Sequence, residues 1–164
     1  MNWAYFHMLI NHFPIIGVFI GTLLLIAGLL YRNQGVQISG LGIVVFAGLT
    51  FILAYLSGDP AKEAVKGLPE VAQSLVNRHE DIASVGMYLL IPAVILAALS
   101  LYSIRKNEKS VQFLIIITLV LSVVSSVAMF YVGHTGGQIR HTEFRSDSSG
   151  KYILEHQKDN VTLD

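Results

Sequence analysis

The hydrophobic residues of this chain form four long runs that polar segments separate. The runs extend from about residue 8 to 31, 36 to 57, 82 to 104 and 111 to 133, and none of them contains Asp, Glu, Lys or Arg. A bilayer core of about 30 Å requires about 20 apolar residues in a helix, and each run is too long for a buried strand. The pattern therefore predicts four transmembrane helices.

The segments between these runs predict how the helices are arranged. Residues 32–35 and 105–110 are short connections, which make consecutive helices antiparallel neighbours. The longer segment 58–81 contains two prolines and is expected to form short surface helices at 61–65 and 69–76. We expect an all-α, integral membrane, antiparallel four-helix bundle over residues 1–143, followed by a polar C-terminal tail over residues 144–164.

The charges near the helix ends predict an orientation. The two short connections together hold four Lys or Arg residues and one acidic residue, whereas segment 58–81 holds three basic and five acidic residues. Cytoplasmic loops carry an excess of Lys and Arg. This places the short connections in the cytoplasm and both termini on the outer side, which in a bacterial inner membrane is the periplasm.

Composition supports a membrane protein and removes several kinds of chemistry. Charged residues make up 13% of the chain, against about 25% in soluble domains. The formal net charge is zero, so nothing indicates a nucleic-acid partner. The chain has no cysteine, which excludes disulfides, iron–sulfur clusters, thiolate metal sites and covalent c-type haem.

All six histidines fall on the predicted outer side of the membrane: His7, His12, His79, His134, His141 and His156. Three different predicted helices thereby bring an imidazole to the same depth. Imidazole is the usual protein ligand of haem iron, and of copper or zinc where thiolates are absent. A single histidine at a helix end is more often an interface residue than a ligand, so the prediction rests on the group.

Within this group we expect His12 with His79, or His79 with His134, to bind haem, and the remaining histidines leave room for a second haem. Pro14 disfavours helical geometry at the residue before it. It therefore favours a break at 11–14 that separates His7, on a preceding amphipathic segment, from the first long helix. The alternative is that Pro14 only starts the helix.

The segment 133–141 is rich in glycine and histidine. Gly136 and Gly137 permit the close approach of a flat cofactor or of another backbone, although glycine is also common where a helix ends. If the helix continues, His134, Gln138 and His141 share one face. Arg140 could then pair with a haem propionate, or with a lipid headgroup.

The residues from His7 to Pro14, with His12-Phe13-Pro14 at their end, resemble the N-terminal hallmark of a family of small bacterial predicted membrane proteins of unknown function. His134, Gly136, Gly137 and His141 resemble its second hallmark, a Gly-Gly element followed by a histidine. Met8 stands where many members have proline, and the spacing from Gly137 to His141 is shorter than usual. The family is similar to small b-type cytochromes, and the resemblance implies haem and electron transfer, with c-type cytochromes as associated proteins.

The sequence thus predicts a membrane b-type haem protein that transfers electrons near the periplasmic face, with one or two haem b groups held by histidines from different helices. Its predicted partners are the lipid bilayer, a c-type cytochrome or respiratory complex, and another copy of itself. The alternatives are a copper- or zinc-binding membrane protein, and a structural subunit of a larger membrane complex. No nucleophile–base pair indicates a stand-alone enzyme.

Overall fold

The structure is a computed structural model that describes residues 2–68, 71–106 and 108–141, with only the backbone of Arg140. This part of the chain is all-helical and contains no β-strand. The predicted tail, residues 144–164, lies outside the described residues. Within the described residues, six helices follow one another: α1 (Trp3–Ile10), α2 (His12–Leu30), α3 (Gln34–Leu56), α4 (Gly58–Val65), α5 (Gln73–Arg105) and α6 (Val111–Arg140).

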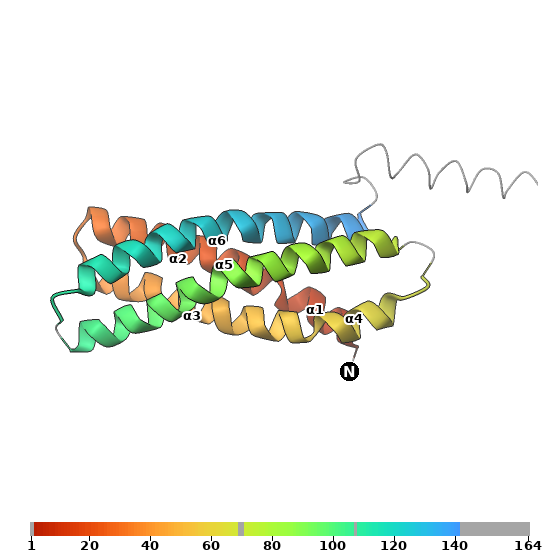
Figure 1. Ribbon diagram of the computed structural model, residues 1–164, viewed down its shortest axis with the longest axis horizontal. Coiled ribbons are helices and arrows are strands. Elements are labelled where there is room, and N and C mark those ends of the chain that lie inside the picture. The colour runs from red at the N-terminus through yellow and green to blue at the C-terminus, as the bar shows by residue number, and fades with distance from the viewer. Residues whose placement is uncertain (1, 69–70, 107, 142–164) are drawn as a thin grey trace, which may run out of the picture.

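Four helical stretches are long and apolar enough to cross a membrane, as the sequence predicts. They comprise α1 with α2, α3 with α4, then α5, and then α6. The four long helices lie side by side along the length of the molecule, with the short helices α1 and α4 together at one end (Figure 1). The predicted surface helix at 61–65 is part of α4.

The last two long helices extend beyond their hydrophobic runs. Helix α5 begins at Gln73 rather than near residue 82, and α6 ends at Arg140 rather than near residue 133. The prediction of a separate short helix at 69–76 is wrong from Gln73 onward, and residues 69 and 70 lie outside the described part. Hydropathy indicates which part of a helix suits lipid and does not indicate where the helix ends. For α5, no Gly or Pro occurs between positions 73 and 82 to end the helix, whereas α6 continues through three glycines, Gly133, Gly136 and Gly137. Consequently His79 and His134 lie inside helices.

The predicted break before the first long helix is present. Helix α1 ends at Ile10, Asn11 separates it from α2, and Pro14 lies in the first turn of α2. A proline there removes no helical hydrogen bond, because the first backbone N–H groups of a helix have no partner within it. His7 is therefore carried by α1, which packs mainly against α4.

Helices α2 and α3 approach closely through glycines. A methyl group at Gly28 would lie 2.8 Å from the backbone nitrogen of Gln37, and one at Gly17 would lie 3.0 Å from the Cβ of Ala47. Such small-residue contacts allow helices to pack tightly in lipid. Gly17 and Gly28 therefore serve the packing of α2 against α3 in the structure.

Helices α5 and α6 form the other closely packed pair. Pro92 lies inside α5, where its missing N–H weakens the backbone hydrogen bonding of the preceding turn. In that turn, the hydroxyl of Ser125 on α6 donates a hydrogen bond to the Leu89 carbonyl at 3.0 Å. A neighbouring helix thus supports the backbone beside the proline, as is common in membrane helices.

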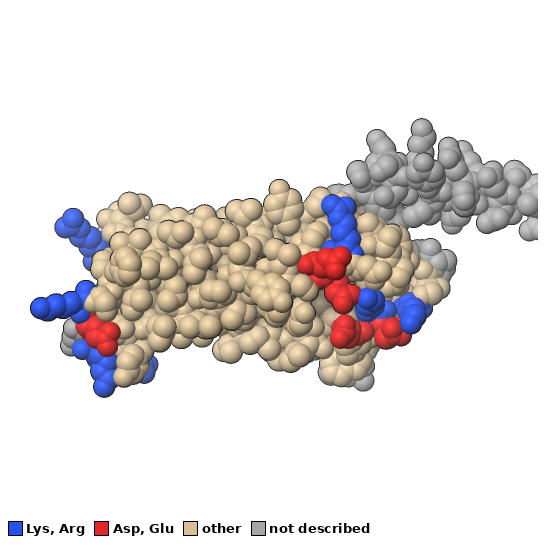
Figure 2. Space-filling model, in the orientation of Figure 1, with Lys and Arg blue, Asp and Glu red and all other residues tan. Residues whose placement is uncertain are grey.

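Charged side chains gather at the two ends of the molecule. Figure 2 shows a broad uncharged middle, a mainly basic group at the end that holds the α2–α3 and α5–α6 connections, and mixed acidic and basic side chains at the opposite end. The uncharged middle has the character that lipid tails require. The mixed end is the one that contains α1, α4 and the histidines.

Candidate functional site

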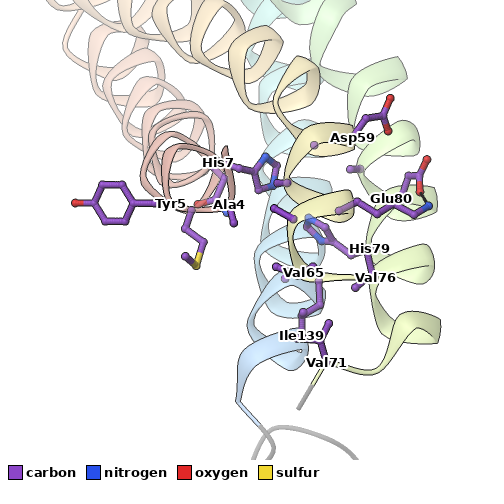
Figure 3. Close-up of a pocket in the computed structure, with 18 of the residues that line it drawn as sticks. Ala4, Tyr5, His7, Asp59, Val65, Val71, Val76, His79, Glu80 and Ile139 are labelled. Carbon is purple, nitrogen blue, oxygen red and sulfur yellow. Dashed lines mark hydrogen bonds and ion pairs between the residues drawn. The ribbon is translucent and has the colours of Figure 1, made fainter. Parts of the chain in front are cut away.

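A cavity of about 500 Å³ lies at the mixed end, between α1, α4, α5 and α6. Its volume falls within the range of small-molecule and cofactor sites, roughly 300–1,000 Å³. Apolar residues such as Ala61, Val65, Val76 and Ile139 form much of its wall, and His7 and His79 lie next to each other on it (Figure 3). An apolar wall with a few polar groups is typical of a ligand site.

The ring of His7 is held by the end of α3. Its Nδ1 lies 2.9 Å from the carbonyl oxygen of Ala54 and 3.0 Å from the hydroxyl of Ser57. A carbonyl oxygen only accepts, and the Ser57 hydroxyl itself donates to the Ala54 carbonyl at 2.8 Å. The proton of the neutral ring is therefore on Nδ1, and Nε2 carries the lone pair.

The ring of His79 is held in the same way by α6. Its Nδ1 lies 3.1 Å from the hydroxyl of Thr135, and that hydroxyl donates to the carbonyls of Tyr131 and Val132, both at 3.1 Å. Because the hydroxyl proton is used there, the oxygen accepts from His79 Nδ1–H. Again Nε2 is the nitrogen with the lone pair.

Gly136 makes room for the His79 ring. A methyl group at this position would lie 3.2 Å from Cε1 of His79. The neighbour of Gly136 is thus an imidazole, which is neither the flat cofactor nor the backbone that the sequence led us to expect there. A methyl group at Gly137 would meet nothing within 4 Å, so the structure shows no close contact for this second predicted glycine.

His7 and His79 form a pair across two helices far apart in sequence. Their ring centroids are 6.4 Å apart, with an angle of 83° between the ring planes. Metals bind imidazole nitrogen at about 2.0–2.1 Å, so two imidazoles on opposite sides of one ion have ring centres roughly 6 Å apart. The spacing therefore suits two ligands of a single metal centre.

The other two predicted helix-borne ligands lie elsewhere. His12 is exposed, its Nδ1 lies 2.8 Å from the Met8 carbonyl one turn before it, and its ring borders a separate shallow apolar groove beside Phe46. His134 is exposed, and its Nε2 lies 3.2 Å from the side-chain nitrogen of Gln138, which donates to it. Neither His12 nor His134 lies on the cavity wall. The structure brings His7 to His79 instead.

The end of α6 holds the remaining predicted site residues. The helix does continue past His134, which places His134 and Gln138 on one face, as the spacing predicts. His141 follows the helix as its exposed C-cap, with its backbone N–H donating to the Gly137 carbonyl at 2.9 Å. The side chain of Arg140 lies outside the described residues, as does His156.

A metal ion held by protein side chains alone is not supported by the described part of the chain. There, no three side chains of His, Cys, Asp or Glu come together in an arrangement that could hold a metal ion. Structural zinc sites use four protein ligands and catalytic sites three. The pair of His7 and His79 provides two.

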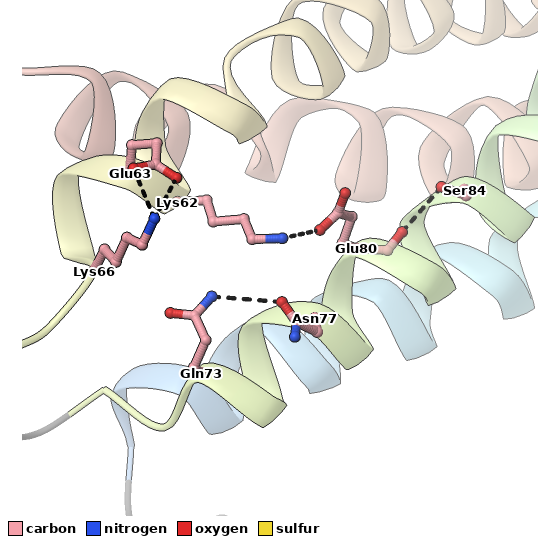
Figure 4. A network of polar contacts seen from close by, with 7 residues as sticks. All are labelled: Lys62, Glu63, Lys66, Gln73, Asn77, Glu80 and Ser84. Carbon is pink, nitrogen blue, oxygen red and sulfur yellow. Dashed lines mark hydrogen bonds and ion pairs between the residues drawn. The ribbon is translucent and has the colours of Figure 1, made fainter.

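The cavity wall also carries an ion pair between α4 and α5. The Nζ of Lys62 lies 2.6 Å from Oε2 of Glu80, and both residues line the cavity (Figure 4). The neighbouring Lys66, the C-cap residue of α4, pairs with Glu63 at 3.2 Å and does not line the cavity.

Sequence reasoning missed the residues that orient the two imidazoles and the lysine beside them. Thr135 lies next to Gly136, which the sequence singles out, but a hydroxyl in an apolar helix usually bonds to its own backbone, and the same holds for Ser57. Lys62 is one of two lysines in segment 58–81. No sequence signal distinguishes these residues, because their partners are 18 to 56 positions away.

Comparison of the chain with protein-family models, with curated proteins and with solved structures finds no match.

Proposed function

We propose that this protein is a b-type haem protein of the bacterial inner membrane that transfers electrons near the periplasmic face. In this proposal His7 and His79 are the residues that would hold one haem b. The observation that carries it is the oriented pair: both Nδ1 atoms donate to protein acceptors, which leaves two Nε2 lone pairs on the wall of an apolar cavity of about 500 Å³. Histidine ligands of metals almost always donate their other ring N–H in this way.

The number of ligands favours haem over copper or zinc. A porphyrin supplies four of the iron's ligands itself, so one or two histidines complete the coordination. Copper and zinc lack this help and require further protein ligands, which the described residues do not assemble around His7 and His79. The size and apolar wall of the cavity also suit a large flat cofactor rather than a bare ion.

The surroundings support a membrane protein with its site near the outer surface. We propose that the four long helices cross the bilayer as an antiparallel bundle, because each is long and apolar enough and charges gather at the two ends. The mainly basic end faces the cytoplasm by the positive-inside rule. The cavity, at the opposite end, then lies within reach of a periplasmic electron-transfer partner, such as a c-type cytochrome or a respiratory complex.

The chain's own residues have limited roles in this proposal. His7 and His79 bind through Nε2, and Ser57, Ala54 and Thr135 keep the rings oriented. The apolar part of the wall would lower the local dielectric beside a bound cofactor, which tunes a redox centre. When bound, haem supplies one-electron chemistry.

An optical spectrum of the purified protein, with and without dithionite, tests this function. We expect a Soret band and reduced α and β bands that are lost in His7→Ala and His79→Ala but retained in the matched variants His12→Ala and His134→Ala. Circular dichroism would show that all four variants remain helical. A protein that lacks haem after expression with added haem precursor, and takes up none when ferric haem is added, would refute the proposal. Bound copper or zinc would then favour a metal-binding protein, and co-purifying subunits without any metal a structural role.

A further inference from the structure

Lys62 has a special position among the charged residues of the mixed end. It lies on the wall of the cavity, and of the described residues that line this cavity it is the only Lys or Arg. The other charged residues on the wall are acidic, Asp59 and Glu80. An anionic group on a ligand in this cavity therefore has one cationic side chain to meet.

The present partner of Lys62 is a carboxylate that a ligand could replace. Glu80 Oε2 lies 2.6 Å from Lys62 Nζ. The side chain of Glu80 is 49% exposed and that of Lys62 is 31% exposed. Ion pairs exposed to this extent contribute little to stability, because water screens the charges. An ammonium group has three donors, and Glu80 accepts one of them. Exchange of the Glu80 carboxylate for a carboxylate of a ligand at Lys62 therefore requires little free energy.

We propose that Lys62 binds a carboxylate of the ligand in this cavity and releases Glu80 when it does so. The apolar wall would enclose the body of the ligand, and Lys62 on α4 would hold its acidic edge. This inference rests on the proposed function, in which the ligand is haem and its carboxylates are the two propionates. It adds the residue that would orient the porphyrin within the cavity.

A purely structural role of the Lys62–Glu80 ion pair would lead to different experimental results. The pair joins α4 to α5, so it could act only by holding these helices together. In that case, removal of either partner would weaken ligand binding alike. If Lys62 instead binds the ligand and Glu80 competes with it, loss of Lys62 weakens binding and loss of the Glu80 charge strengthens it.

Two titrations of the haem-free protein in detergent, one with ferric haem and one with haem dimethyl ester, distinguish ligand binding by Lys62 from a purely structural role of the ion pair. The ester retains the ring and the iron but lacks the carboxylates. The variants are Lys62→Met, Glu80→Gln and the control Lys66→Met, which removes the lysine that caps the C-terminal end of α4 and does not line the cavity. A charge-assisted hydrogen bond of this kind predicts about tenfold weaker haem binding by Lys62→Met.

We further expect about two- to threefold tighter haem binding by Glu80→Gln, unchanged binding by Lys66→Met, and equal affinity of the wild type and Lys62→Met for the ester. Equal haem affinity of the wild type and Lys62→Met would refute this inference and leave the haem site intact. So would a loss of affinity in Lys62→Met that is as large for the ester as for haem, or weaker haem binding by Glu80→Gln. A wild-type protein that binds neither compound would instead refute the proposed function.

Discussion

The Nδ1 atom of His79 lies 3.1 Å from the hydroxyl oxygen of Thr135, which is 56 positions away in the sequence. This contact holds the imidazole of His79, on α5, against α6. It also fixes which nitrogen of the ring carries the proton, since the Thr135 hydroxyl donates to its own helix. The contact can be removed without altering the proposed ligand itself.

Thr135→Val should weaken haem binding while leaving the helices intact. Valine keeps the shape of threonine but cannot accept from His79, so the ring loses the partner that orients it. Loss of such a partner typically weakens metal binding about 10- to 100-fold. Titration with ferric haem and the reduction potential of the bound haem would measure the effect.

Two further substitutions control this prediction. Thr135→Ser keeps the acceptor and should restore both affinity and potential. Thr50→Val removes a hydroxyl that donates only to its own helix, at Phe46 and Ala47, and should leave both unchanged. Equal behaviour of the valine and serine variants at position 135 would contradict a role for the hydroxyl.

Gly136→Ala and Gly137→Ala should differ although the residues are adjacent. The added methyl group at position 136 would press on the His79 ring from 3.2 Å, whereas at position 137 it would meet nothing within 4 Å. We expect Gly136→Ala to displace the ring and weaken haem binding several-fold. Gly137→Ala should stabilise the helix by up to about 1 kcal/mol, because alanine is the better helix former. Haem titration and thermal unfolding followed by circular dichroism would show this, and equal haem affinity in both variants would contradict it.

Gly28→Ala should destabilise the contact between α2 and α3. Its methyl group would lie 2.8 Å from backbone nitrogen of Gln37, and the backbone cannot yield as a flexible side chain can. Overpacking of this kind costs about 1–3 kcal/mol. Gly42→Ala is the matched control on α3, since its methyl group would meet nothing within 4 Å. Reversible unfolding in mixed micelles would compare the two free energies of unfolding, and a smaller loss for Gly28→Ala than for Gly42→Ala would rule out this account of the contact.

The proposed orientation can be tested with single cysteines, because the natural chain has none. Lys66→Cys lies at the mixed end, and Lys109→Cys lies in the connection at the mainly basic end. In spheroplasts we expect a membrane-impermeant maleimide to label Lys66→Cys at once and Lys109→Cys only after lysis. The reverse pattern would invert the topology, and labelling of both in intact spheroplasts would argue against a chain that spans the membrane.

The sequence alone determined the four long apolar helices, because four runs without a charged residue are a strong local signal for helices in lipid. It also predicted the break before α2 from Pro14. The break lies at Asn11 and Phe13 is helical, because Pro14 has no N–H for the carbonyl of Ile10, the last residue of α1. The start of α5 and the end of α6 were not predictable from hydropathy. Hydropathy falls where the surroundings of a helix become polar, and both helices continue beyond that point.

For the candidate site, the sequence indicated that histidines gather at one end, and the tertiary structure decided which of them meet. The expected partners of His79 were His12 and His134, yet neither of them lines the cavity. The ring of His7 reaches His79 because the break at Asn11 lets the preceding helix, α1, pack against α4. Long-range packing of this kind sets which side chains converge, and no local spacing in a single chain encodes it.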